Sequence, residues 1–76
     1  NDTALTRTFA FASFPDAIAF VTRLGFYAES VNHHPDIDVR YSKVTVTWST
    51  HDAGGLTEKD EAGATATDAL YGKRVS

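Results

Sequence analysis

The chain has 76 residues, no cysteine and a net charge of −3 at pH 7, with seven Lys and Arg scattered along the sequence. This composition predicts one small domain and excludes disulfides, thiolate metal sites and the basic stripe that follows a nucleic-acid backbone. No apolar run approaches the roughly 18 to 20 residues that span a bilayer, and the first residues lack the basic-then-apolar pattern of a signal peptide. We therefore expect a cytoplasmic protein that contacts neither a membrane nor nucleic acid directly.

Residues 5–12 predict the first strand, because their side chains alternate in character. The alternation places two sets on opposite sides of the backbone: Leu5, Arg7, Phe9 and Phe11 on one, and Thr6, Thr8, Ala10 and Ala12 on the other. This pattern fits a strand at the edge of a sheet or close to the edge.

The next segment predicts a long helix that ends near Asn32. Ser13 is followed three residues later by Asp16, with Pro15 in the first turn, which is the pattern of a capping box. Apolar residues then recur every three or four positions and predict a stripe that faces the core: Phe14, Ala17, Ile18, Val21, Leu24, Gly25, Ala28 and Val31.

Residues 41–51 predict the clearest strand of the chain. Two sets of side chains face opposite ways, with Val44, Val46 and Trp48 on one side and Lys43, Thr45, Thr47, Ser49 and His51 on the other. The sequence also leaves room for a short strand around Ile37–Val39.

A second capping box, Thr57 with Asp60, opens a helix that we expect to run to about Tyr71 and to end at Gly72. The order strand, helix, strand, helix predicts the α+β class. We expect a two-layer sandwich in which the helices pack on one face of an antiparallel sheet, with residues 1–76 forming a single domain.

The three histidines are the first candidates for chemistry. A residue that precedes proline is disfavoured in helical conformations, so Pro35 places His33 and His34 at or just after the helix C-terminus. The helix carbonyls there favour protonated imidazoles, which makes both rings candidate proton donors near neutral pH. His51 ends the long strand, and a layered fold could bring all three rings to one pocket. The alternative, in which these histidines only cap a helix or face solvent, stays open.

A metal site and a serine-type triad are weaker interpretations. Adjacent residues in extended backbone point to opposite sides, so His33 and His34 are poorly placed to bind one ion, and no HxH or HxxxH spacing occurs. No serine has the surroundings of a nucleophile elbow. We therefore expect no metal.

Two carboxylates lie near the histidines in this scheme. Asp60 is by default a helix cap, but the same carboxylate could also face the histidines. Glu29 is by default a solvated residue of the first helix, yet it lies one turn before His33 and could hold that imidazole in orientation.

The spacing of these residues resembles the signature of the pterin-4a-carbinolamine dehydratase family. That signature is carried here by Glu29, the tripeptide His33-His34-Pro35, Tyr41, His51 and Asp60. The surrounding text, NHHPDIDVRYSKVTVTWSTHDAGGLTEKD, is similar to the bacterial members of the family.

The resemblance extends from Leu5 to Leu70, with one departure. Members of the family usually carry a further N-terminal segment that includes a first strand with a tryptophan near the pocket. We expect that the present chain begins after that segment.

The resemblance implies elimination of water from a 4a-hydroxytetrahydropterin to give the quinonoid dihydropterin, a step in the recycling of tetrahydrobiopterin. The implied partner is the pterin substrate, and no metal, flavin or nicotinamide cofactor is implied. The expected site comprises His33, His34 and His51 as catalytic acid–base groups, Pro35, Thr50, Asp52 and Ala53 as contacts of the pterin, and Glu29 and Asp60 as residues that support the histidines.

The alternative is a non-catalytic protein-binding module. Animal members of the family also serve as dimerisation cofactors of a homeodomain transcription factor, and other relatives resemble assembly chaperones with a degraded site. All three histidines are present in this chain, which favours an enzyme over either role.

The first helix also predicts self-association. Phe20 and Tyr27 widen its apolar stripe to about half of the circumference, and Phe26 lies on the otherwise polar side. The second helix has only Leu70 and Tyr71 as large apolar side chains, so we expect it to leave part of this surface uncovered. A homo-oligomer, at least a dimer, would cover it; the resemblance implies a tetramer of two dimers whose sheets join edge to edge.

Overall fold

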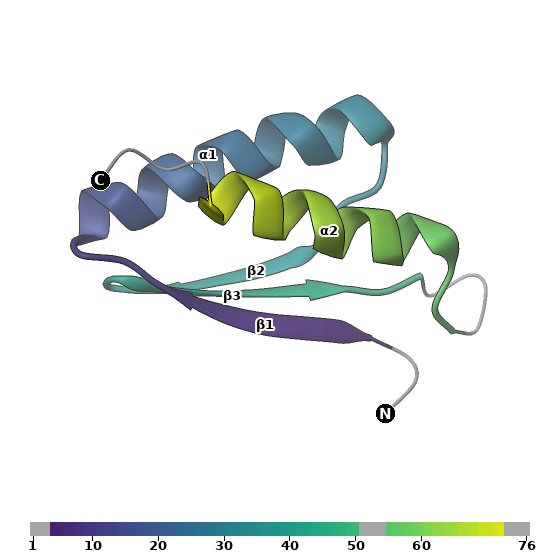
Figure 1. The fold of residues 1–76 in the computed structure, drawn as a ribbon, viewed down its shortest axis with the longest axis horizontal. Coiled ribbons are helices and arrows are strands. Elements are labelled where there is room, and N and C mark those ends of the chain that lie inside the picture. The colour runs from purple at the N-terminus through teal and green to yellow at the C-terminus, as the bar shows by residue number, and fades with distance from the viewer. Residues whose placement is uncertain (1–3, 51–54, 73–76) are drawn as a thin grey trace.

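A computed structural model describes residues 4–50 and 55–72, which fold into two layers (Figure 1). The elements in chain order are β1 (Leu5–Ala10), α1 (Phe14–Val31), β2 (Asp36–Arg40), β3 (Lys43–Trp48) and α2 (Glu58–Gly72). Both helices cover the same face of the sheet, which confirms the predicted α+β sandwich. Within the described ranges, neither helix is long and apolar enough to cross a membrane.

The three described strands form an antiparallel sheet in the order β1-β3-β2. Phe9 pairs with Val44, and Val44 pairs in turn with Val39, so apolar side chains line one face of the sheet. The opposite face of β1 and β3 carries threonines, and the Oγ1 atoms of Thr8 and Thr45 lie 2.8 Å apart. The alternation predicted for both strands is therefore confirmed.

The long strand begins two residues later than predicted. Tyr41 and Ser42 form the turn between β2 and β3, and Arg40 pairs with Lys43 across it. Tyr41 has a positive φ of 54°, a conformation that is uncommon for a bulky residue and that breaks the strand locally. The first strand also ends earlier than predicted, at Ala10.

Helix α1 begins and ends with recognisable caps. The Oγ of Ser13 accepts a hydrogen bond from the backbone N–H of Asp16 (3.2 Å), as the capping box predicts. At the other end, Asn32 is in the left-handed conformation with φ 53°, and the N–H of His33 donates to the carbonyl of Ala28 (3.2 Å). This Schellman motif stops the helix before Pro35 is reached.

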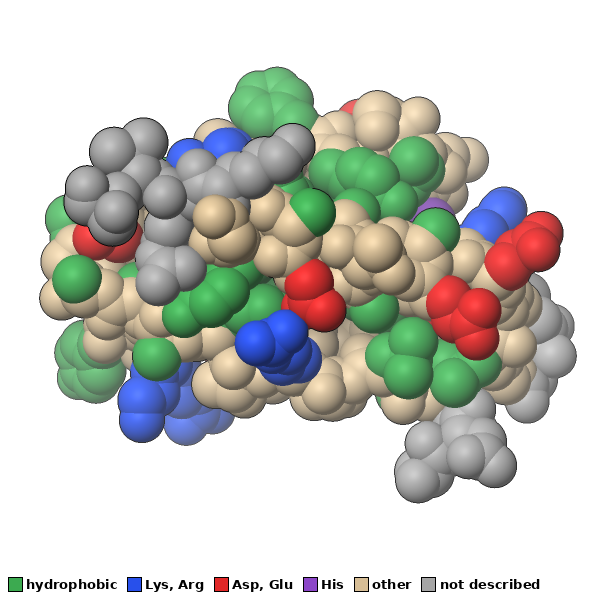
Figure 2. Space-filling view, viewed as in Figure 1, with side chains coloured by type: hydrophobic (Ala, Val, Ile, Leu, Met, Phe, Trp, Pro, Cys, Tyr) green, Lys and Arg blue, Asp and Glu red, His purple; other side chains and the backbone are tan. Residues whose placement is uncertain are grey.

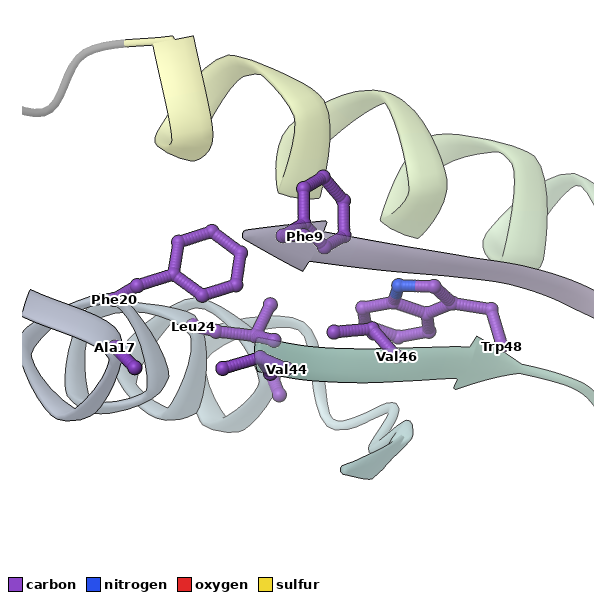
Figure 3. Close-up of a cluster of buried hydrophobic side chains, with 8 residues drawn as sticks. Phe9, Ala17, Phe20, Leu24, Val44, Val46 and Trp48 are labelled. Atoms are coloured by element: carbon purple, nitrogen blue, oxygen red, sulfur yellow. The ribbon is translucent and has the colours of Figure 1, made fainter. Parts of the chain in front are cut away.

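The core lies between the sheet and both helices, and Figure 3 shows most of its side chains. The buried apolar residues are Phe9, Ala17, Phe20, Leu24, Ala28, Val44, Val46 and Trp48. The large stripe residues Phe14, Ile18 and Val31 expose 54%, 39% and 43% of their surface. Gly25 is exposed as well, and Val21 is half-buried. Phe14 and Val31 are the terminal residues of the helix.

Phe20, which widens the stripe, is fully buried. Its ring centroid lies 5.2 Å from that of Phe9 and 6.1 Å from that of Tyr71 in α2. The hydroxyl of Tyr71 donates to the carbonyl of Ala10 (2.8 Å), which holds the phenol ring over this cluster. Helix α2 therefore covers Phe20, whereas Phe26 is 75% exposed, so part of the apolar surface of α1 stays uncovered, as predicted.

Candidate active site

The candidate site lies where the C-terminal end of α1, the end of β3 and the start of α2 meet. Asp60 lies at its centre and is fully buried. Its position follows from the capping box, because Asp60 Oδ2 accepts from the backbone N–H of Thr57 (3.1 Å), while Thr57 Oγ1 accepts from the N–H of Lys59 (3.3 Å). The predicted helix start is thus confirmed.

The Asp60 carboxylate also binds two side chains from other elements. Thr50, just after β3, donates its hydroxyl to Oδ2 (2.6 Å), and His33, just after α1, donates Nε2–H to Oδ1 (2.7 Å). Burial raises the pKa of the Asp60 carboxyl, but hydrogen bonds from Thr50, His33 and Thr57 outweigh it and leave the pKa below its ordinary value of 3.8. Asp60 is therefore a buried carboxylate, and Nε2 of His33 carries a hydrogen.

Two contacts hold the His33 imidazole: the hydrogen bond from Nε2 to Asp60 and the ring contact with Trp48. The His33 side chain is only 15% exposed, and its ring centroid lies 5.4 Å from that of Trp48, with an angle of 31° between the planes. The alternation of residues 41–51 predicts Trp48 to lie in the core, and no pattern in the sequence assigned it a part in the site. A tryptophan two residues before Thr50 on the core side of β3 was the available signal.

Glu29 has a different partner from the one expected. Its Oε1 accepts from Nε2 of His34 (2.9 Å) rather than from His33. The reason is the left-handed Asn32, which ends the helical spacing and swings His33 toward α2. Both Glu29 and His34 are well exposed, with 81% and 58% of their side chains in solvent.

The remaining predicted contacts of the pterin lie partly outside the described residues. Pro35 is half-buried beside the histidines, and Thr50 has its hydroxyl committed to Asp60. His51, Asp52 and Ala53 fall within 51–54, outside the described ranges.

The arrangement suits proton transfer. A carboxylate that accepts from one imidazole nitrogen fixes the tautomer and leaves the other nitrogen for proton exchange. For His33 the bound nitrogen is Nε2, so Nδ1 is the nitrogen that can act on a ligand. Over residues 4–50 and 55–72, no three His, Cys, Asp or Glu side chains are grouped so that they could hold a metal ion.

Residues 1–70 match the sequence profile of the family described as pterin 4 alpha carbinolamine dehydratase. The chain belongs to that family. A relative from Chloroflexus aggregans, provisionally named a pterin-4-alpha-carbinolamine dehydratase, is 57% identical over 72 residues, which cover 95% of this chain and 77% of the relative. A protein of Chloroflexus aurantiacus with the same provisional name is 59% identical over 68 residues, covering 90% of this chain and 73% of the relative.

Two solved structures of the dehydratase family type have the same fold. A transcriptional coactivator/pterin dehydratase from Brucella melitensis is 37% identical, with a TM-score of 0.88 over 93% of this chain and 76% of that one. A pterin dehydratase-like protein identified as a RuBisCO assembly factor of the alpha-carboxysome is 28% identical, with a TM-score of 0.81 over 97% of this chain and 86% of that one.

Proposed function

We propose that this chain dehydrates 4a-hydroxytetrahydropterins and that His33, held by Asp60, moves a proton in that reaction. The 4a oxygen must receive a proton and leave as water, while N5 loses its proton so that the C4a=N5 double bond can form. The observation that carries the proposal is the 2.7 Å hydrogen bond from His33 Nε2 to the buried Asp60 carboxylate. Such a carboxylate orients an imidazole and stabilises its protonated form.

In this mechanism Nδ1 of His33 exchanges the proton with the pterin. Asp60 stays ionised throughout, because its pKa lies below the ordinary value. A positioned general acid or base contributes about 10² to 10⁴ in rate.

His34 and His51 take the other proton-transfer positions. His34 is oriented by Glu29 through the 2.9 Å hydrogen bond, and its larger exposure leaves it accessible to an incoming pterin. The reaction needs both a proton donor and a proton acceptor, and two separately held histidines can supply these two roles.

The pterin ring would lie against Pro35, Asp52 and Ala53. The hydroxyl of Thr50 is bound to Asp60, so its backbone is the part that remains for the pterin. Through this hydrogen bond, Thr50 links two parts of the proposed site: Asp60, which holds His33, and the segment that we propose contacts the substrate.

The test is the initial rate at which purified variants consume the 4a-carbinolamine. His33→Ala should lower kcat about 10²-fold or more, and the double change of His34 and His51 to Ala should have an effect at least as large. Glu61→Gln, an exposed change on α2, serves as the control. A folded His33→Ala variant with native kcat would overturn the assignment of His33.

We also propose that the chain forms a homo-oligomer through α1. Phe26 is 75% exposed, and Phe14 and Ile18 also reach solvent; on the face shown in Figure 2, hydrophobic side chains come to the surface in several groups. Exposed large apolar side chains of this kind are typical of protein–protein contacts.

A protein-binding role is the second candidate function. The observation that favours it is the shared fold with the RuBisCO assembly factor at 28% identity. The rate measurement separates the two candidates, because a binding module without catalysis would leave the carbinolamine to decay at its uncatalysed rate.

A further inference from the structure

Trp48, the only tryptophan in the chain, packs its indole against the imidazole of His33. The 5.4 Å separation of the ring centroids lies in the range in which aromatic rings attract each other. Trp48 is 1% exposed and projects from β3 on the face that the helices cover (Figure 3).

The indole is itself fixed by a polar anchor from α2. Its Nε1–H donates to Oγ1 of Thr67 (2.9 Å), and the Thr67 hydroxyl donates in turn to the carbonyl of Gly63 (2.7 Å). Thr67 is 2% exposed, so water does not compete for these bonds. A buried N–H without such a partner would carry a desolvation penalty, which ties the indole to this one position.

Gly63 supplies the second constraint on the indole. A Cβ built at Gly63 would lie 2.5 Å from Cδ2 and 2.6 Å from Cε2 and Cε3 of Trp48, closer than real carbon atoms approach. The backbone of α2 therefore lies directly against the ring, and any side chain at this position would push the indole away. The lack of a side chain at Gly63 in α2 leaves the space that the Trp48 ring fills.

We propose that Trp48 is a positioning residue for the dehydration reaction, held by Thr67 and Gly63 so that its ring sets the orientation of His33. The covalent bond to Cβ and the hydrogen bond from Nε2 to Asp60 fix two ends of the imidazole, so the ring can still turn about the line between them. Contact with the indole restricts this rotation and so fixes the direction of Nδ1. The inference rests on the proposed role of His33, and it adds a residue whose side chain meets the imidazole rather than the pterin.

The kinetic test removes the anchoring hydroxyl without replacing Trp48 itself. Thr67→Val keeps the shape of the side chain but loses the hydroxyl. We expect it to lower kcat by about tenfold and to change KM little. A misplacement of 1 Å can cost roughly 10²-fold in rate, so a smaller shift of His33 accounts for a tenfold loss. Thr67→Ser keeps the hydroxyl and should restore most of the lost kcat. Thr65→Val, an exposed change on the same helix, is the matched control. Equal kcat values for folded Thr67→Val and Thr65→Val would overturn the proposal.

A spectroscopic test needs no substrate. Selectively excited emission reports Trp48 alone, and a protonated imidazole in contact with an indole quenches it. Emission should fall as the pH is lowered through the range in which histidine takes up a proton. Asp60, the other titratable group bound to His33, stays ionised through this range because its pKa lies below 3.8.

Variants assign this quenching to the contact. His33→Gln should abolish the pH-dependent step, and Thr67→Val should reduce it, while Thr65→Val leaves it at the native size. Persistence of the full step in His33→Gln or in Thr67→Val would overturn the proposal whether or not the chain is a dehydratase. Absence of dehydratase activity from the native chain, with the quenching pattern intact, would instead overturn the proposed function and confine Trp48 to orienting His33.

Discussion

Replacing Asp60 by Asn removes one charge from the centre of the candidate site and changes little in shape. Three donors lie within 3.1 Å of the carboxylate: the hydroxyl of Thr50, Nε2 of His33 and the backbone N–H of Thr57. An asparagine side chain has one acceptor oxygen, and its NH₂ group is a donor. The Thr50 hydroxyl can turn to accept from that group, but His33 and Thr57 cannot both keep the acceptors that they now have.

The loss of stability in Asp60→Asn follows from the burial of these hydrogen bonds. A hydrogen bond to a charged group contributes about 1.5 to 3 kcal/mol, and a buried donor left without an acceptor costs about 1 to 3 kcal/mol. We expect Asp60→Asn to lower the free energy of unfolding by about 2 to 3 kcal/mol. For a domain of this size that corresponds to a decrease in Tm of about 10 to 20 °C.

Asp16→Asn is the matched control, because Asp16 occupies the same position in the capping box of α1 but is exposed. Its interaction with the helix dipole should contribute only about 0.3 to 1 kcal/mol. Urea unfolding followed by circular dichroism gives both free energies, and the rate of carbinolamine consumption gives kcat for the same samples. Only Asp60→Asn should also lower kcat.

Equal losses of stability in the two variants would refute the reasoning, since they would show that Asp60 acts only as a helix cap. A double-mutant cycle with His33→Gln sharpens the test. Because the two side chains are in direct contact, we expect a coupling energy of about 1 kcal/mol or more. A coupling energy near zero would show that the hydrogen bond between His33 and Asp60 does not contribute to stability.

Three further predictions follow from the same structure. The pKa of Asp60 in the folded state lies below 3.8, its value in the unfolded chain. The stabilisation from the Asp60 carboxylate is therefore fully present above pH 3.8 and is lost as the pH falls through the folded-state pKa. In acid unfolding, the free energy of unfolding of Asp60→Asn should fall less steeply with pH than that of the native chain. Light scattering should report a mass of at least twice the 8.3 kDa of one chain. Phe26→Glu should lower this mass because Phe26 is exposed, whereas Phe20→Glu should unfold the chain because Phe20 is buried. A folded, active monomer would contradict the proposed oligomer. Chelator treatment should leave dehydration unchanged, and stoichiometric zinc whose removal abolishes activity would contradict histidine acid–base catalysis.

The sequence by itself determined the elements and their inward faces. Alternation along β3 placed Val44, Val46 and Trp48 in the core, and two capping boxes marked the starts of α1 and α2. These features depend on interactions between residues a few positions apart, so they can be inferred without knowing the rest of the fold.

The sequence also singled out His33 and Asp60 through the family signature, and Thr50 as an expected contact of the pterin. It did not give their pairing. His33 and Asp60 are separated by 27 positions, and the assignment of Glu29 to His33 failed because it assumed that helical spacing continues past Asn32. One residue in the left-handed conformation was enough to give Glu29 His34 instead of His33 as its partner.

Only the tertiary structure decided which part of the wide apolar surface of α1 is covered. Phe20 is buried because Tyr71, far along the chain in α2, reaches over it, and Trp48 enters the site because Gly63 leaves room for its ring. Both outcomes depend on where α2 packs, which no pattern within one helix or strand specifies. Periodicity shows which residues face the core, but the elements packed against each face decide which side chains are buried and which of them meet.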